Sequence, residues 1–138
     1  MRMRRVAAGV AVAVLLAAAP AAAHHAFSSE FDINKPFKFR GVLTKWEMIN
    51  PHSWFHFEVK GDDGAVAEWM IEGGSPNSLI KQGVTKRTLA IGTEMLIEGY
   101  QAKDGTNKGV GRKLVLADGR RLFLGGESNL PDKKPEGK

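Results

Sequence analysis

An alternating run of residues followed at once by a turn is the feature that most constrains how this chain can fold. Apolar and polar side chains alternate over Trp54–Val59, which places Phe55 and Phe57 on one face. The run Gly61–Gly64 is a turn signal, and a second alternating run follows over about 65–72. A period of two on both sides of a turn predicts an antiparallel hairpin with one buried face.

The register of this hairpin follows from matching the two apolar faces, because a slip of one residue would turn every side chain to the wrong side. The predicted register pairs residues before the turn with residues after it as follows: Phe55 with Trp69, Phe57 with Ala67, Trp54 with Met70, His56 with Glu68, and His52 with Glu72.

The rest of the chain supplies further strands and one helix. Strands are predicted at about 37–49, 94–102 and 113–116, with the last leading through Asp118-Gly119 into about 121–124. Ser75 and Pro76 are typical of a helix start, so a short helix is predicted between the third and fourth strands. This order predicts a mainly β fold, a small five-stranded Greek-key barrel like the OB-fold, with a small sandwich or an SH3-like barrel as the alternatives.

The first 23 residues have the pattern of a secretory signal peptide. Three arginines precede an apolar run, and Ala21–Ala23 forms a small-residue cleavage site. The apolar run is shorter than the roughly 20 residues that a membrane-spanning helix needs. We therefore expect a cut after Ala23, with a cut after Ala22 as the alternative. We also expect a periplasmic mature protein that is soluble once the signal is removed.

Cleavage changes the charge of the protein and sets its size. The full chain has 20 basic and 15 acidic residues, and losing three arginines lowers its net charge from +5 to about +2. Such a small charge, in an exported protein, argues against a nucleic-acid partner. The chain has no cysteine, so disulfides cannot hold the fold. The expected segments are a cleaved signal peptide at 1–23, an arm at 24–36, a barrel domain at 37–126 and a disordered tail at 127–138.

The four histidines of the chain fall into two pairs and suggest a metal site. His24 and His25 open the mature chain, while His52 and His56 flank the start of the alternating run. The amine and ring of a terminal His24 can chelate one ion together, and a nitrogen from either later histidine would complete a set suited to Cu(II). A cut after Ala22 would instead place His25 third in the mature chain, where amine, amides and ring can also bind copper.

Other residues support either this reading or a metal-free one. Glu68 and Glu72 are the carboxylates expected beside His52 and His56. They would either hydrogen-bond the metal-binding histidine rings or simply lie on an exposed face. In the alternative function, the outward face around Trp54 and Met70 docks a protein or another component of the cell envelope. No nucleophile elbow, catalytic carboxylate pair or zinc-protease helix motif occurs in the sequence, so we expect a binding module rather than an enzyme.

Several longer motifs carry a resemblance to a known family. These are Ala23–Phe27, Asn50–His56, Glu72–Asn77 and Gly99–Gly105. Together they resemble a family of small exported bacterial proteins classed as a domain of unknown function. The resemblance implies export and a small β-barrel, and it implies no activity, ligand or catalytic residue.

Overall fold

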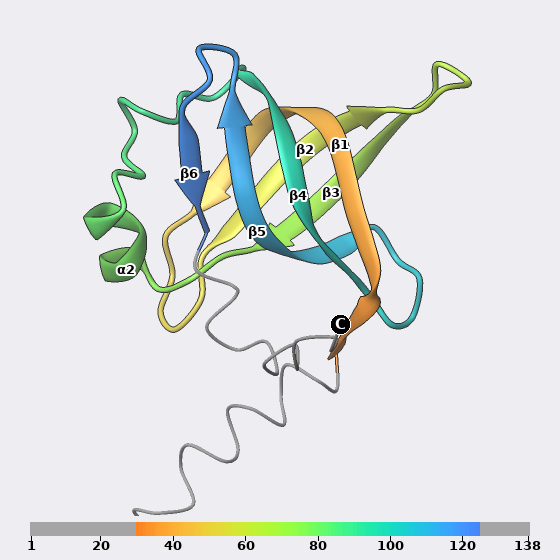
Figure 1. Ribbon diagram of the computed structural model, residues 1–138, viewed down its shortest axis with the longest axis horizontal. Coiled ribbons are helices and arrows are strands. Elements are labelled where there is room, and N and C mark those ends of the chain that lie inside the picture. Colours follow the sequence, from red (N-terminus) through yellow and green to blue (C-terminus); the bar gives the residue numbers. More distant parts are fainter. Residues whose placement is uncertain (1–29, 125–138) are drawn as a thin grey trace, which may run out of the picture.

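A computed structural model of the protein describes residues 30–124 (Figure 1). The predicted signal peptide, its cleavage site, His24, His25 and the predicted tail lie outside the described residues. The described part is mainly β, with one six-stranded sheet and one short helix, which confirms the predicted class. The number of strands is six rather than five, because the segment after Asp118-Gly119 pairs as a separate short strand.

The strands follow one another in the sheet in the order β3-β2-β1-β4-β5-β6. Their bounds, with that of the helix, are β1 (Phe31–Glu47), β2 (Trp54–Lys60), β3 (Val66–Glu72), α2 (Pro76–Lys81), β4 (Glu94–Ala102), β5 (Lys108–Leu116) and β6 (Arg121–Phe123). Neighbours in this order are antiparallel. In addition, β3 pairs in parallel with β5 over Met70–Glu72, so the sheet curls until these two strands meet.

The inner face of the curled sheet carries the main core. Leu43, Phe55, Phe57, Ile71 and Ile97 have no exposed surface. The predicted buried face of β2 is therefore confirmed. Burial of large apolar side chains is the dominant stabilising contribution to a fold of this size, which has no disulfide to assist it.

The strand β1 begins earlier than the sequence indicated. It starts at Phe31 rather than at residue 37, so the described part of the expected arm belongs to the sheet. Phe31 pairs with Ala102 and is 3% exposed, packed with Tyr100 and Val110 in a second small core. This contact holds the segment to the body across an irregularity between Phe31 and Pro36.

The hairpin of β2 and β3 forms with a register two residues away from the predicted one. Trp54 lies opposite Glu72 and His56 lies opposite Met70. The loop is longer than a tight turn, because the N–H of Gly61 donates to the carbonyl of Ala65 at 2.8 Å. A shift of two residues leaves every side chain on its predicted face, so the pattern of buried residues was predicted correctly while the partners were not.

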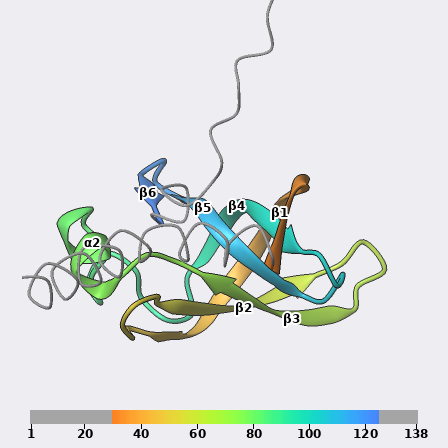
Figure 2. The same ribbon diagram turned by 90° about the horizontal axis from the view of Figure 1, so that it is seen from below.

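The helix α2 covers the end of the sheet opposite the β2–β3 loop (Figures 1 and 2). Ser75 caps it as predicted, accepting a hydrogen bond from the N–H of Ser78 at 3.3 Å, and Leu79 is fully buried. Among the described residues no helix is long and apolar enough to cross a membrane.

Candidate functional site

His52 lies just before β2, where the backbone fixes it beside the end of β3. The N–H of Ser53 donates to the carbonyl of Gly74 at 2.9 Å, and the N–H of Gly73 donates to the carbonyl of Ser53 at 2.8 Å. These bonds extend the pairing of the two strands beyond Trp54. As predicted, the His52 ring meets Glu72, and its Nδ1 contacts Oε1 of that carboxylate.

The two ring nitrogens of His52 have different surroundings. Nδ1 faces Glu72, whereas Nε2 makes no hydrogen bond or ion pair with any residue in the range 30–124. The His52 side chain is 42% exposed and that of Glu72 is 10% exposed. A carboxylate that accepts the Nδ1 proton fixes the tautomer and leaves a lone pair on Nε2. Metal-binding histidines commonly have this arrangement, in which one ring nitrogen donates to a carboxylate and the other binds the metal ion.

Charged and aromatic side chains surround this pair. The ammonium of Lys108 lies 5.0 Å from the centre of the Trp54 ring and bonds the carboxylate of Glu30. We call His52, Trp54, Glu72, Lys108 and Glu30 the His52 cluster. Burial raises the pKa of Glu72, against the opposing charge of His52. The carboxylate of Glu72 is thus poorly solvated, so a positive charge nearby stabilises its ionised form.

Both ring nitrogens of His56 contact carboxylates, whereas only one ring nitrogen of His52 does. Its Nδ1 lies 3.2 Å from Oε1 of Glu68, as the predicted contact required, and its Nε2 lies 3.0 Å from Oε2 of Glu47. Both ring nitrogens are thus occupied by carboxylate oxygens. With both carboxylates in place, neither nitrogen is open to a metal ion. His56 therefore ties β1 to β3 across the outer face of β2.

The structure does not gather the described histidines and carboxylates into one metal site. Within residues 30–124, no group of three or more His, Asp or Glu side chains is placed to hold an ion. His52 and His56 are held by different carboxylates on the same face of the sheet. Trp54 and Met70 are both half-buried, and the large apolar side chains that are most exposed lie elsewhere on the described surface.

Three residues that contact His56 or belong to the His52 cluster were not predicted from the sequence. Glu47 was placed in a strand but not assigned as a partner of His56. Lys108 and Glu30 reach the His52 cluster through the parallel β3–β5 pairing and the early start of β1. Neither feature has a local sequence signal, because both depend on contacts between segments far apart in the chain.

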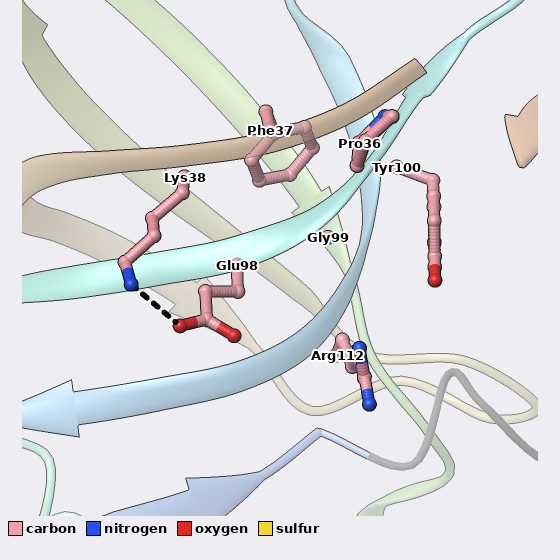
Figure 3. Close-up of a pocket in the computed structure, with 7 residues that line it drawn as sticks. All are labelled: Pro36, Phe37, Lys38, Glu98, Gly99, Tyr100 and Arg112. Carbon is pink, nitrogen blue, oxygen red and sulfur yellow. Dashed lines mark ion pairs between the residues drawn. The ribbon is translucent and has the colours of Figure 1, made fainter. Parts of the chain in front are cut away.

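A second surface feature lies over β1, β4 and β5 (Figure 3). It is a hollow of about 320 Å³ lined by Pro36, Phe37, Lys38, Glu98, Gly99, Tyr100 and Arg112. It lies where the pairing of β4 with β5 shifts register between Glu98 and Gly99. No role for these residues was predicted from the sequence.

Comparison with known proteins places the whole described site within one family match. A family model described as "Family of unknown function (DUF6152)" matches residues 11–112. This range contains all four histidines and every member of the His52 cluster. No curated protein and no solved structure matches the chain.

Proposed function

The chain belongs to this family of unknown function, whose description assigns no activity, and we propose that it is an exported module that binds Cu(II) through His52 together with His24 and His25. The periplasm is the proposed compartment. The arginine-rich start, the apolar run and the alanine cleavage site support export.

One observation carries the metal-binding proposal: the His52 ring has Glu72 on Nδ1 and no described partner on Nε2. The geometry also narrows the choice between the two later histidines, because both nitrogens of His56 already contact carboxylates. His52 is therefore the proposed ligand, Glu72 its supporting carboxylate, and His56 a structural residue.

The position of Glu30 supports His24 and His25 as the other ligands of the proposed copper site. Glu30 joins the His52 cluster through Lys108, and His24 and His25 precede Glu30 closely in the sequence. His25 lies five positions before Glu30, and an extended chain spans about 3.3–3.6 Å per residue. This gives a reach of roughly 17 Å from Glu30, which supports the proposal that an imidazole and the terminal amine of His24 bind the same ion as Nε2 of His52.

The proposal also includes the finer description of the fold as a closed, OB-fold-like barrel. The strand order and the added β3–β5 pairing support it, since they give the cyclic order β1-β2-β3-β5-β4. The helix between β3 and β4 supports the same assignment. This likeness in fold implies no function, since one fold supports many activities.

A Cu(II) titration with matched histidine variants tests the proposal. The protein is purified from periplasm and its N-terminus is confirmed by mass spectrometry. We expect one tight site, weakened at least about tenfold in His52→Gln and in His24→Ala. His56→Gln is the matched control and is expected to bind copper as the wild type does. Thermal unfolding establishes that each variant is folded.

Equal affinity in wild type and His52→Gln would contradict the proposal. Binding that is lost only in His24→Ala would identify a chelating terminus that does not involve the sheet. In that case the metal-free module, which docks an envelope partner through the face around Trp54 and Met70, would become the working account.

A further inference from the structure

We propose that the end of the molecule formed by α2 and the segment after it docks on a lipid bilayer that carries anionic headgroups. We call residues 75–93 the α2 lobe. In Figures 1 and 2 this lobe stands at the opposite end of the molecule from the β2–β3 loop. The lobe contains no member of the His52 cluster, so lipid binding there is a property distinct from copper binding.

The α2 lobe is fixed to the body of the protein along one side. Leu79, Val84 and Leu89 have no exposed surface and belong to the main core. The chain after the helix is held by Thr88, whose hydroxyl donates to the carbonyl of Gly83 at 2.5 Å. Because the buried side is fixed in this way, the remaining side chains of the lobe face outward in a defined arrangement.

Two isoleucines lie on the exposed side of the lobe. Ile80 is 55% exposed and Ile91 is 58% exposed. Single exposed apolar side chains are common on protein surfaces, so these two indicate a partner only together with the charges around them. Side chains of this kind bind a bilayer by entering the layer between the headgroups and the acyl chains.

The charges around these isoleucines are all positive. Lys81, Lys86 and Arg87 are exposed, and residues 73–93 include no aspartate or glutamate. None of the three cations makes an ion pair or a side-chain hydrogen bond with any residue from 30 to 124. Cations on the strands and turns of the sheet do pair with carboxylates, as those of Lys38, Arg40, Lys45, Lys113 and Arg120 show. The lobe thus presents three cations to an anionic partner.

The opposite end of the molecule has the opposite charge. Residues 58–68, around the β2–β3 loop, include four acidic residues and one basic residue, all of them exposed: Glu58, Asp62, Asp63, Glu68 and Lys60. A negatively charged surface repels this end and attracts the α2 lobe. The separation of charge therefore orients the protein with the lobe toward an anionic bilayer.

The composition of the lobe favours a bilayer over an acidic protein. Protein–protein interfaces are depleted in lysine and enriched in aromatic residues, whereas the lobe has two lysines and no aromatic residue. Binding at a lipid interface combines apolar side chains among the headgroups with lysine and arginine at the phosphates. Each cation near an anionic membrane surface strengthens binding about fivefold, so three cations contribute on the order of a hundredfold.

The test is cosedimentation of the metal-free mature protein with vesicles of phosphatidylglycerol and phosphatidylcholine in equal parts, compared with vesicles of phosphatidylcholine alone. We expect stronger binding to the anionic vesicles, weakened as the salt concentration rises. The double variant Lys86→Gln, Arg87→Gln is expected to lower the affinity about twenty-fivefold. Ile80→Asn is expected to lower it about fivefold. The matched controls Lys60→Gln and Val66→Asn make equivalent changes at exposed positions beside the β2–β3 loop and should bind like the wild type.

Three results would overturn the proposal. These are equal binding to the two kinds of vesicle, equal affinity of the wild type and the double variant, or an equal loss in Lys60→Gln and in Lys86→Gln alone. Binding to polyglutamate but not to vesicles, lost in the double variant, would also overturn it and would identify an acidic protein as the partner. Because the assay contains no copper, its outcome does not depend on whether His52 binds a metal.

Discussion

Replacing Ser53 with alanine is expected to stabilise the protein, which is the reverse of the usual effect of a core substitution. Ser53 is fully buried, and its Oγ has no hydrogen-bond partner among the described residues. A buried polar group without a partner costs about 1–3 kcal/mol of desolvation. Removing the oxygen also removes its packing contacts, at roughly 0.1–0.2 kcal/mol each. The net expected gain is about 1 kcal/mol in the free energy of unfolding.

The assay is thermal and urea unfolding of wild type, Ser53→Ala and Ser75→Ala. For a domain of this size, about 1 kcal/mol corresponds to a rise in Tm of about 4–8 °C. Ser75→Ala makes the same chemical change at the cap of α2, where the hydroxyl accepts from the N–H of Ser78. That variant should lose about 0.5–2 kcal/mol. A lower stability of Ser53→Ala would refute the reasoning, because it would mean that the hydroxyl has a favourable partner inside the protein.

Two further predictions concern the closure of the sheet and the outer face. Gly111→Ala should cost about 1–3 kcal/mol, because a Cβ there would press on the Leu124 side chain and lie 2.7 Å from Cγ2 of Ile71 in β3. Unchanged urea unfolding would count against the close approach of β5 to these two side chains. The hydrogen bonds of Lys45 and His56 lower the pKa of Glu47 from its usual 4.5, so its contribution to stability is present above that pH and is lost as the pH falls through the lowered value. The stability difference between wild type and Glu47→Gln should therefore be present at pH 7 and disappear in acid, and a difference that grows in acid would be inconsistent with it.

Local sequence patterns predicted where the strands and the helix lie better than they predicted which residues pair across the sheet. The alternation of β2, the bounds of β4 and the cap of α2 depend on neighbouring residues, and all three were predicted correctly. The hairpin register was wrong by two residues, because it depends on the hydrogen bonds of the loop after Lys60. The glycine-rich start of β5 resembles a loop in sequence, and it becomes strand because β3 and β4 pair with it.

In the candidate site, too, contacts between neighbouring strands were easier to predict from the sequence than contacts between segments far apart in the chain. The contact of His52 with Glu72 was predicted from the sequence, although the register from which it was predicted is wrong by two residues. The second carboxylate of His56, Glu47, was not predicted, since it comes from β1 through a pairing that no local pattern fixes. Lys108 could not be assigned either, because it reaches Trp54 only where the sheet curls.

The most direct test of the central claim is electron paramagnetic resonance of the mature protein with one equivalent of Cu(II). The comparison is between wild type, His52→Gln and His56→Gln, with pulsed spectra that detect coordinated imidazole nitrogen. The account predicts that His52→Gln loses one imidazole from the copper spectrum while His56→Gln leaves the spectrum unchanged. Identical spectra for wild type and His52→Gln would contradict it, and so would loss of an imidazole in His56→Gln alone.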